Sequence, residues 1–319
     1  MLEKIKKKIL ISVVIAALSY LALTIYLDSD KVVESFRNFN WLLIPLLLVL
    51  SFGNYLTRFF KWQYYLKLIR VDVNFKDSFS IFMSGLIMSV TPGKFGELLK
   101  SYLIKQVNGT SISKTAPIVF AERATDFLSL TLIALIGAYH FNYGKTVTLI
   151  ILLILISLIL MLTNKKIADK ILSYLSNIKV FKNHLQKIKN AYESSFVLFK
   201  LKSLLLMTAL SIVSWGFEAF GFYLILTYYQ SEINLLWSFF SYSFSTIVGA
   251  VSMLPGGIGV TEGSLTLLLI NKGLSDNDAL AATFIVRVVT LWFAVLVGVI
   301  SVMLYKKRFG EILFDQSKD

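Results

Sequence analysis

The stretch "SVTPGKFGELLKSYLIK", Ser89–Lys105, interrupts an apolar segment with a Pro-Gly pair and then adds Lys94 and Glu97. A bilayer penalises a broken helix, whose backbone amides lose their partners, and it also penalises buried charges. A second stretch, "SMLPGGIGVTEGSLTLLLI" at Ser252–Ile270, repeats this combination. These two passages decide the fold, because each must satisfy its interrupted backbone inside protein or in a water-filled cavity.

The surrounding chain has the composition of a polytopic helical membrane protein. Of its 319 residues, 56% are hydrophobic and 16% are charged, and the mean hydropathy is +0.71. Soluble domains carry about 25% charge. The absence of cysteine excludes disulfides and thiolate chemistry, and the two histidines lie on opposite sides of one predicted span. We therefore expect no metal, no cofactor and no nucleic-acid partner, and we assign the net charge of +13 to cytoplasmic loops.

Six apolar runs are long enough to cross a bilayer, which takes about 20 residues. We predict full spans at 9–27, 41–64, 115–141, 146–163, 203–229 and 279–304. The first has the basic start of a signal peptide, but the length of its apolar run favours an uncleaved helix. The two Pro-Gly passages, 75–105 and 233–271, are predicted as re-entrant hairpins, because each arm is short for a full span.

The distribution of basic residues predicts the orientation. With the N-terminus in the cytoplasm and both passages as hairpins, 25 of the 32 basic residues are cytoplasmic, four are outside and three arginines lie within spans. This asymmetry follows the positive-inside rule. Ten full spans would instead place the lysine-rich segment 164–202 outside, so we reject them. Both termini are thus predicted to be cytoplasmic, with 164–202 an amphipathic segment along the anionic inner leaflet or, alternatively, a solvated linker.

The sequence contains an internal repeat at a shift of about 163 positions. Ser89, Pro92, Gly93 and Gly96 align with Ser252, Pro255, Gly256 and Gly259, and Phe120 and Arg123 align with Phe284 and Arg287. Because the two copies start on opposite sides of the membrane, we predict an inverted repeat, an architecture of secondary transporters with a binding site near the midplane.

We accordingly predict one all-α membrane domain, 1–319. Its parts are a first span and outer loop (9–40), repeat 1 (41–141), a linking span (146–163), the basic segment (164–202), repeat 2 (203–304) and a cytoplasmic tail (305–319).

Ionisable side chains within the predicted spans indicate a polar chamber. Glu122, Arg123 and Asp126 in "FAERATDF" share one helix face. Arg58, Lys94, Glu218 and Arg287 join this predicted chamber because of their depth in the membrane and their positions in the two repeats. Gly96 permits close backbone approach. A helix that begins just after each Pro-Gly pair would direct its positive dipole end at an anion. The alternative interpretation is that these groups form ion pairs that hold the hairpins to the helices.

With "TPGKFGELLKSYLIK", "ERATDF" and "LPGGIGVTEGSL", the chain resembles the lysylphosphatidylglycerol synthase membrane-domain family, also called flippase-like domain proteins. The resemblance implies a membrane domain that moves an aminoacylated phospholipid across the bilayer. Because the chain stops at Asp319, it implies a stand-alone translocator rather than a lysyltransferase. The functional positions that it carries over are Pro92, Gly93, Glu97, Glu122, Arg123, Asp126, Pro255, Gly256, Gly257, Gly259 and Glu262.

The resulting expectation is a flippase or scramblase of the cytoplasmic membrane, not an enzyme. Its substrate would be an anionic or aminoacylated phospholipid or a polyprenyl-phosphate lipid. The chain lacks a Walker motif, so energy would come from an ion gradient or from the lipid's own gradient. Membrane lipids are the expected partners. A separate lipid-synthesising enzyme is a further possible partner. The alternatives are a small-solute or ion-coupled secondary transporter and an integral-membrane enzyme that acts on lipid headgroups with carboxylates as acid and base.

Overall fold

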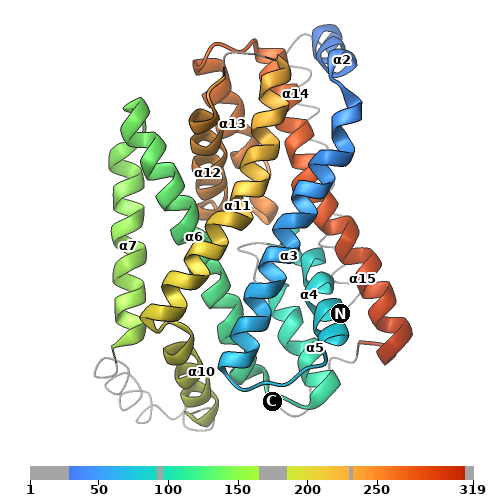
Figure 1. Ribbon diagram of the computed structural model, residues 1–319, viewed down its shortest axis with the longest axis vertical. Helices are drawn as coiled ribbons and strands as arrows, with labels where there is room; N and C mark the ends of the chain where they lie inside the picture. Colours follow the sequence, from blue (N-terminus) through green and yellow to red (C-terminus); the bar gives the residue numbers. More distant parts are fainter. Residues whose placement is uncertain (1–28, 92–95, 165–184, 230–232, 313–319) are drawn as a thin grey trace.

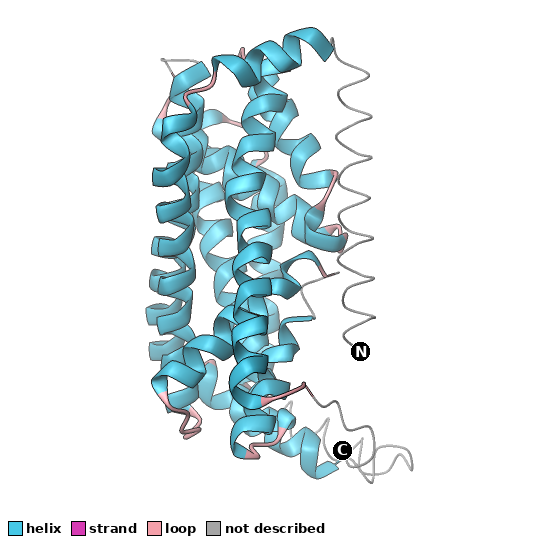
Figure 2. Ribbon diagram, turned by 90° about the vertical axis from the view of Figure 1, so that its right-hand side faces the viewer, coloured by secondary structure: helices cyan, strands magenta, loops and turns pink. Residues whose placement is uncertain are grey.

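A computed structural model describes residues 29–91, 96–164, 185–229 and 233–312 (Figure 1). Every regular element in these ranges is a helix, which confirms the all-α prediction. The helices form an elongated bundle in which most run along the long axis (Figure 2). The predicted span 9–27 lies outside the described residues, as do Pro92, Gly93 and Lys94.

Within the described residues, three helical runs are long and apolar enough to cross a membrane. They are Trp41–Leu68, which joins the 3₁₀ turn η1 (Trp41–Leu43) to α3 (Ile44–Leu68); α11 (Leu201–Tyr229); and Asp276–Phe309. Two further helices lie at the predicted spans 115–141 and 146–163, α6 (Ile112–Phe141) and α7 (Lys145–Thr163). Each begins and ends within a few residues of its predicted span, because the apolar runs set the helix lengths.

The segment predicted as an outer loop contains an additional helix, α2 (Ser29–Asn38). Val32 is buried, the Phe36 ring packs edge-on against Phe284 at 5.3 Å, and the Ser35 hydroxyl donates to Asp278 at 2.8 Å. These contacts fasten α2 to α14 (Asp276–Arg287). The sequence gives little sign of this helix, because α2 is short and polar, with one narrow apolar stripe.

Both Pro-Gly passages consist of two helical arms with a break between them. In the first, α4 (Phe75–Gly85) and the 3₁₀ turn η2 (Leu86–Val90) are followed by α5 (Leu99–Asn108). In the second, α12 (Leu235–Val251) and the turn η4 (Pro255–Gly257) are followed by α13 (Val260–Asn271). A 3₁₀ turn over 96–98 leads directly into α5.

The two arms of each passage have their outer ends side by side. Asn108 at the end of α5 donates to the Asp72 carbonyl, just before α4, at 2.9 Å. The Lys272 ammonium, just after α13, lies 5.3 Å from the Trp237 ring near the start of α12. In each passage the chain therefore returns to the end of the bundle from which it came.

The two passages start from different ends of the bundle. At one end, Lys114 donates to the Arg70 carbonyl and Gln106 to the Glu311 carbonyl, and α10 (Leu185–Leu198) packs against α6 (Figure 1). We call this the basic end. At the other end, Tyr229 donates to the Ser35 carbonyl, and the Phe141 and Trp237 rings meet at 4.9 Å. The first passage belongs to the basic end and the second to the opposite end.

The last predicted span contains a π-helical turn. Helix α14 continues into η5 (Val288–Trp292), whose backbone is π-helical, and then into α15 (Phe293–Phe309). The Thr290 carbonyl of this turn accepts a hydrogen bond from the Tyr55 hydroxyl at 2.8 Å. Single π-helical turns occur frequently at functional sites.

The two breaks contact each other in the middle of the bundle. Val90 of η2, Ile258 after η4, Leu291 of η5 and Val295 of α15 form a small buried apolar cluster. This cluster joins the two halves of the molecule where the breaks meet.

Helix α15 and the turn η2 approach so closely at one position that only glycine fits there. Helix α15 packs against η2 at Gly298, where an added Cβ would overlap the backbone of Ile87. We expect Gly298→Ala to destabilise the protein by about 1–3 kcal/mol, because the backbone must shift to admit the methyl group. Thermal unfolding of the purified protein in detergent measures this as a lowered Tm.

Gly263→Ala is the matched control. Gly263 also lies within a helix, and nothing stands within 4 Å of an added Cβ. Alanine is favoured over glycine in a helix by about 1 kcal/mol, so its Tm should be unchanged or raised. Equal Tm values for the two variants would show that the packing of α15 on η2 is not tight.

Candidate functional site

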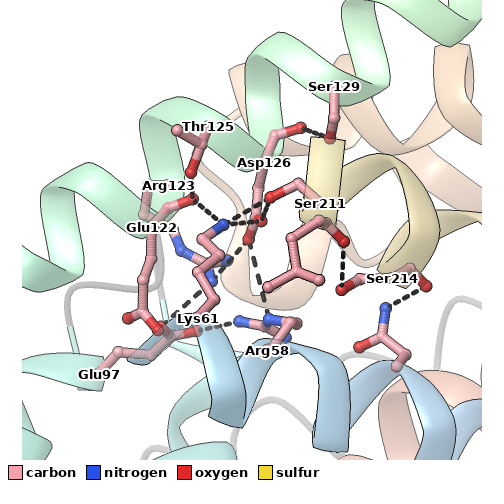
Figure 3. A network of polar contacts seen from close by, with 12 residues as sticks. Arg58, Lys61, Glu97, Glu122, Arg123, Thr125, Asp126, Ser129, Ser211 and Ser214 are labelled. Atoms are coloured by element: carbon pink, nitrogen blue, oxygen red, sulfur yellow. Dashed lines mark hydrogen bonds and ion pairs between the residues drawn. The ribbon is translucent and has the colours of Figure 1, made fainter. Parts of the chain in front are cut away.

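Seven charged side chains from α3, α5, α6 and the turn before α5 meet in the half of the bundle nearer the basic end. Figure 3 shows six of them, all except Lys100. We call them the charged cluster: Arg58, Lys61, Glu97, Lys100, Glu122, Arg123 and Asp126. Six are buried, and Arg123 is partly accessible. The cluster contains four cations and three carboxylates. Such a concentration of buried charge is stable only if each group is paired.

Asp126 is the most heavily engaged carboxylate of the cluster. Its Oδ1 lies 2.6 Å from the Lys61 ammonium and accepts from the Ser211 hydroxyl at 2.9 Å. Its Oδ2 lies 2.9 Å from the Arg123 guanidinium and 3.8 Å from that of Arg58. Lys61 uses its other protons on Ser211 at 2.6 Å and on the Glu122 carbonyl at 3.1 Å. Asp126 therefore ties α3, α6 and α11 together.

Glu97, which follows the first break, is held by three cations. Its carboxylate oxygens lie 3.4 Å from Arg123, 3.7 Å from Arg58 and 3.8 Å from Lys100. The Lys100 ammonium also pairs with Glu122 at 2.5 Å and lies 4.7 Å from the Trp62 ring centre. These contacts fix the chain after the first break against α3 and α6.

The second break has its own ion pair. The Arg287 Nε lies 2.6 Å from Glu262 Oε1, and another Arg287 nitrogen donates to the Gly256 carbonyl at 2.6 Å. The other Glu262 oxygen accepts from the Gly259 N–H at 2.7 Å. Gly256 has φ +62°, a conformation that glycine adopts without strain. The chain's own carboxylate thus occupies the N-terminus of α13, which we had expected to be free for an anion.

A cavity of about 300 Å³ lies between the two halves of the molecule. Cavities of this size hold small ligands or headgroups. Its charged walls come from Arg58, Arg123, Asp126, Glu218 and Arg287. On α11, Glu218 accepts a hydrogen bond from Tyr242 at 2.6 Å, and both side chains line the cavity. The π-helical turn contributes Thr290 and Leu291.

The structure divides the predicted site residues between the cavity and its support. Those that line the cavity are Arg58, Arg123, Asp126, Glu218, Gly256, Gly257 and Arg287. Those that do not line it are Gly96, Glu97, Glu122, Pro255, Gly259 and Glu262. Several of the charges that line the cavity, among them Arg123, Asp126 and Arg287, also form ion pairs.

Two members of the charged cluster, Lys61 and Lys100, were not predicted as site residues. Both were counted among the 25 cytoplasmic basic residues, whereas both side chains are buried. Their spacing held the missing signal: Lys61 is three residues after Arg58, and Lys100 is three residues after Glu97. Residues three apart share a helix face, so these lysines could have been grouped with the buried charges.

The arrangement of guanidinium groups suits an anion. Arg58, Arg123 and Arg287 approach one cavity from three helices, and a guanidinium presents a planar fork of donors that matches phosphate. The ion pairs of Arg58 are 3.7 and 3.8 Å long, and among the described residues it makes no hydrogen bond. Its N–H groups are available to a ligand. The described residues contain no cluster of His, Cys, Asp or Glu suited to a metal ion.

These features define a helical membrane protein with a charged cavity at its centre. The family described as the lysylphosphatidylglycerol synthase TM region matches residues 9–298, and the chain belongs to this family. A UPF0104 membrane protein of Methanothermobacter thermautotrophicus is 23% identical over 336 residues, which cover 98% of this chain and 99% of the relative. One from Methanocaldococcus jannaschii is 29% identical over 225 residues, covering 67% and 92%. One from Pyrococcus horikoshii is 28% identical over 275 residues, covering 77% and 82%.

The buried pair of Lys61 and Asp126 should contribute strongly to stability. Lys61→Met removes one of the cations that compensate Asp126, and we expect it to lower the free energy of unfolding by about 3 kcal/mol. The exposed pair of Lys306 and Glu311 offers the control, because Lys306→Met should cost less than about 1 kcal/mol. Denaturant unfolding in detergent compares the two variants.

A double variant separates the loss of charge balance from the loss of packing. Lys61→Met with Asp126→Asn removes one cation and one anion together, and Arg58 and Arg123 keep Glu97 as a partner. The double variant should therefore be more stable than the sum of the two single losses predicts. If the double variant is as unstable as the sum of the single ones, the two side chains do not act as a pair.

Proposed function

We propose that this protein is a lipid translocator that moves an anionic or aminoacylated phospholipid, or a polyprenyl-phosphate lipid, across the cytoplasmic membrane. The observation that carries the proposal is the cavity of about 300 Å³ with Arg58, Arg123 and Arg287 in its walls. The lipid phosphate would bind these arginines while the acyl chains stay in the bilayer. Asp126 and Glu218 would face an ammonium group where the headgroup carries one. Membership of the family supports a lipid rather than a soluble solute.

The proposed architecture is an inverted repeat of six full spans and two re-entrant hairpins. Corresponding positions of the two copies support it. The ion pair of Glu97 and Arg123, at 3.4 Å, matches that of Glu262 and Arg287, at 2.6 Å. Each pair joins the segment after a break to the helix that follows the passage.

The starts of the two passages match as well. The Asn74 side chain caps α4 by accepting from the Lys76 N–H, and the Asn234 side chain caps α12 by accepting from the Leu236 N–H. The two passages return to opposite ends of the bundle, as an inverted repeat requires. Transporters of this type alternate access by moving one repeat against the other around a central site.

In the proposed orientation, the basic end faces the cytoplasm. Arg70, Lys114 and Arg308 lie there, and positive charge marks cytoplasmic loops. Both termini would then be cytoplasmic. The apolar cluster of Val90, Ile258 and Leu291 would seal the cavity between the breaks, and their separation would open it.

The proposal treats the buried carboxylates as structural and binding groups, not as catalysts. Glu97, Glu122 and Asp126 each face at least one cation within 4.0 Å, so each is engaged in an ion pair. A lipid-headgroup enzyme would instead need one carboxyl group available to accept and release a proton in contact with the substrate.

The test is the movement of headgroup-labelled lipids across reconstituted vesicles. Lysylphosphatidylglycerol, phosphatidylglycerol and a polyprenyl phosphate would be compared with empty vesicles. Arg123→Gln should slow the preferred lipid about tenfold or more, because it removes a charge-assisted hydrogen bond worth about 1.5–3 kcal/mol. Arg308→Gln, which breaks a surface pair with Asp77, should leave the rate unchanged.

Other outcomes would point to the rival functions. Saturable uptake of inorganic phosphate or an amino acid without lipid movement would identify a solute transporter. A chemically altered headgroup would identify an enzyme. If Arg123→Gln and the unaltered protein move the lipid at equal rates, the cavity is not the route of the lipid headgroup.

A further inference from the structure

The cavity reaches the surface of the protein at a rim of apolar side chains. Phe120 is 51% exposed, Met253 is 51% exposed and Leu254 is 45% exposed, and all three line the cavity. We call them the rim residues. Other apolar side chains of its wall, such as Val119 and Leu130, are buried. The cavity therefore opens between α6, which carries Phe120, and the segment between α12 and η4, which carries the other two.

The opening of the cavity exists because the second Pro-Gly break ends α12 early. Helices α6 and α12 pack closely near the opposite end, where an added Cβ on Gly137 would overlap Phe240. Nearer the basic end, α12 stops at Val251 while α6 continues along Phe127 and Phe120. A full-length α12 would cover this stretch of α6. The break leaves it uncovered.

Charged groups lie directly behind the apolar rim. Arg123 is three residues after Phe120 on α6, and so one helical turn away on the same face. Gly256 is two residues after Leu254, and its carbonyl accepts a hydrogen bond from Arg287. A ligand at the opening thus meets apolar side chains first and guanidinium groups next.

An apolar rim in front of guanidinium groups suits an amphiphilic ligand better than a free anion. A soluble anion gains nothing from the rim and would lose its hydration in crossing it. A bilayer lipid can leave its acyl chain on the rim while its phosphate reaches the arginines. Exposed apolar surface next to a polar site is typical of such binding surfaces.

We propose that the gap between α6 and the end of α12 is a lateral portal for a phosphate-bearing bilayer lipid. This inference rests on the proposed function and adds the route by which the substrate enters. The acyl chain lies over Phe120, Met253 and Leu254, and the phosphate passes between them to Arg123 and Arg287.

The sequence allows a precise test, because the chain has no cysteine. Single variants Phe120→Cys and Leu254→Cys would each be labelled with a bulky maleimide. The matched controls are Ile136→Cys on α6 and Leu267→Cys on α13, both at positions 63% exposed and absent from the cavity wall. Movement of fluorescent phosphatidylglycerol in reconstituted vesicles is then compared before and after labelling.

We expect labelling at Phe120→Cys and Leu254→Cys to slow the movement at least tenfold and labelling of the controls to leave it unchanged. Equal rates for labelled rim and control variants would overturn the portal while the translocator stands. If the unlabelled protein moves no lipid, the proposed function itself fails, and the portal with it.

A second measurement reads binding instead of movement. A benzophenone maleimide attached at Phe120→Cys should crosslink phosphatidylglycerol at least several-fold better than a diacylglycerol with the same chains, and Arg123→Gln should abolish the preference. At Ile136→Cys the two lipids should crosslink equally. Equal crosslinking of both lipids at Phe120→Cys would contradict the portal, because no headgroup would then be drawn to the arginines behind it.

Discussion

The need to compensate the buried carboxylate of Asp126 organises the half of the molecule nearer the basic end. A charge in a low-dielectric interior is tolerated only with close partners of opposite sign and with hydrogen bonds. Lys61 and Ser211 supply these on one side of Asp126 and Arg123 on the other. Since these residues come from α3, α11 and α6, the pairing fixes three long helices relative to one another.

The same constraint governs the broken backbone. Where α12 stops, the carbonyl of Gly256 and the N–H of Gly259 lose their helical partners, and Arg287 and Glu262 satisfy them. The ion pair is thus part of the repair of the break. In the first passage, the Gly96 N–H donates to the Thr91 hydroxyl, and Glu97 engages the arginines and Lys100. Burying these charged side chains costs free energy, but they also satisfy backbone groups that the interrupted helices leave without partners.

Much of the fold could be predicted because its causes are local. The apolar runs define the long helices, and the Pro-Gly pairs define the two breaks. Arg58, Arg123 and Arg287 stand out because each is charged within an apolar run. Lys61 was not recognised because it lies nearer the end of α3, where a lysine usually reaches solvent. The helix α2 and the π-helical turn depend on tertiary contacts, which periodicity does not contain. The division between cavity-lining and supporting charges needed the geometry itself.

The π-helical turn at Val288–Trp292 makes this region intolerant of changes in chain length. An α-helix turns by about 100° per residue, and a π-helical turn accommodates one additional residue. Deletion of that residue would restore regular α-helix and rotate all of α15 relative to α14. Gly298 would then no longer face Ile87, and Tyr305 would lose the Leu103 carbonyl. Connecting loops tolerate insertions and deletions, but this turn should not. Sequences of distant relatives should therefore align at Val288–Trp292 without gaps.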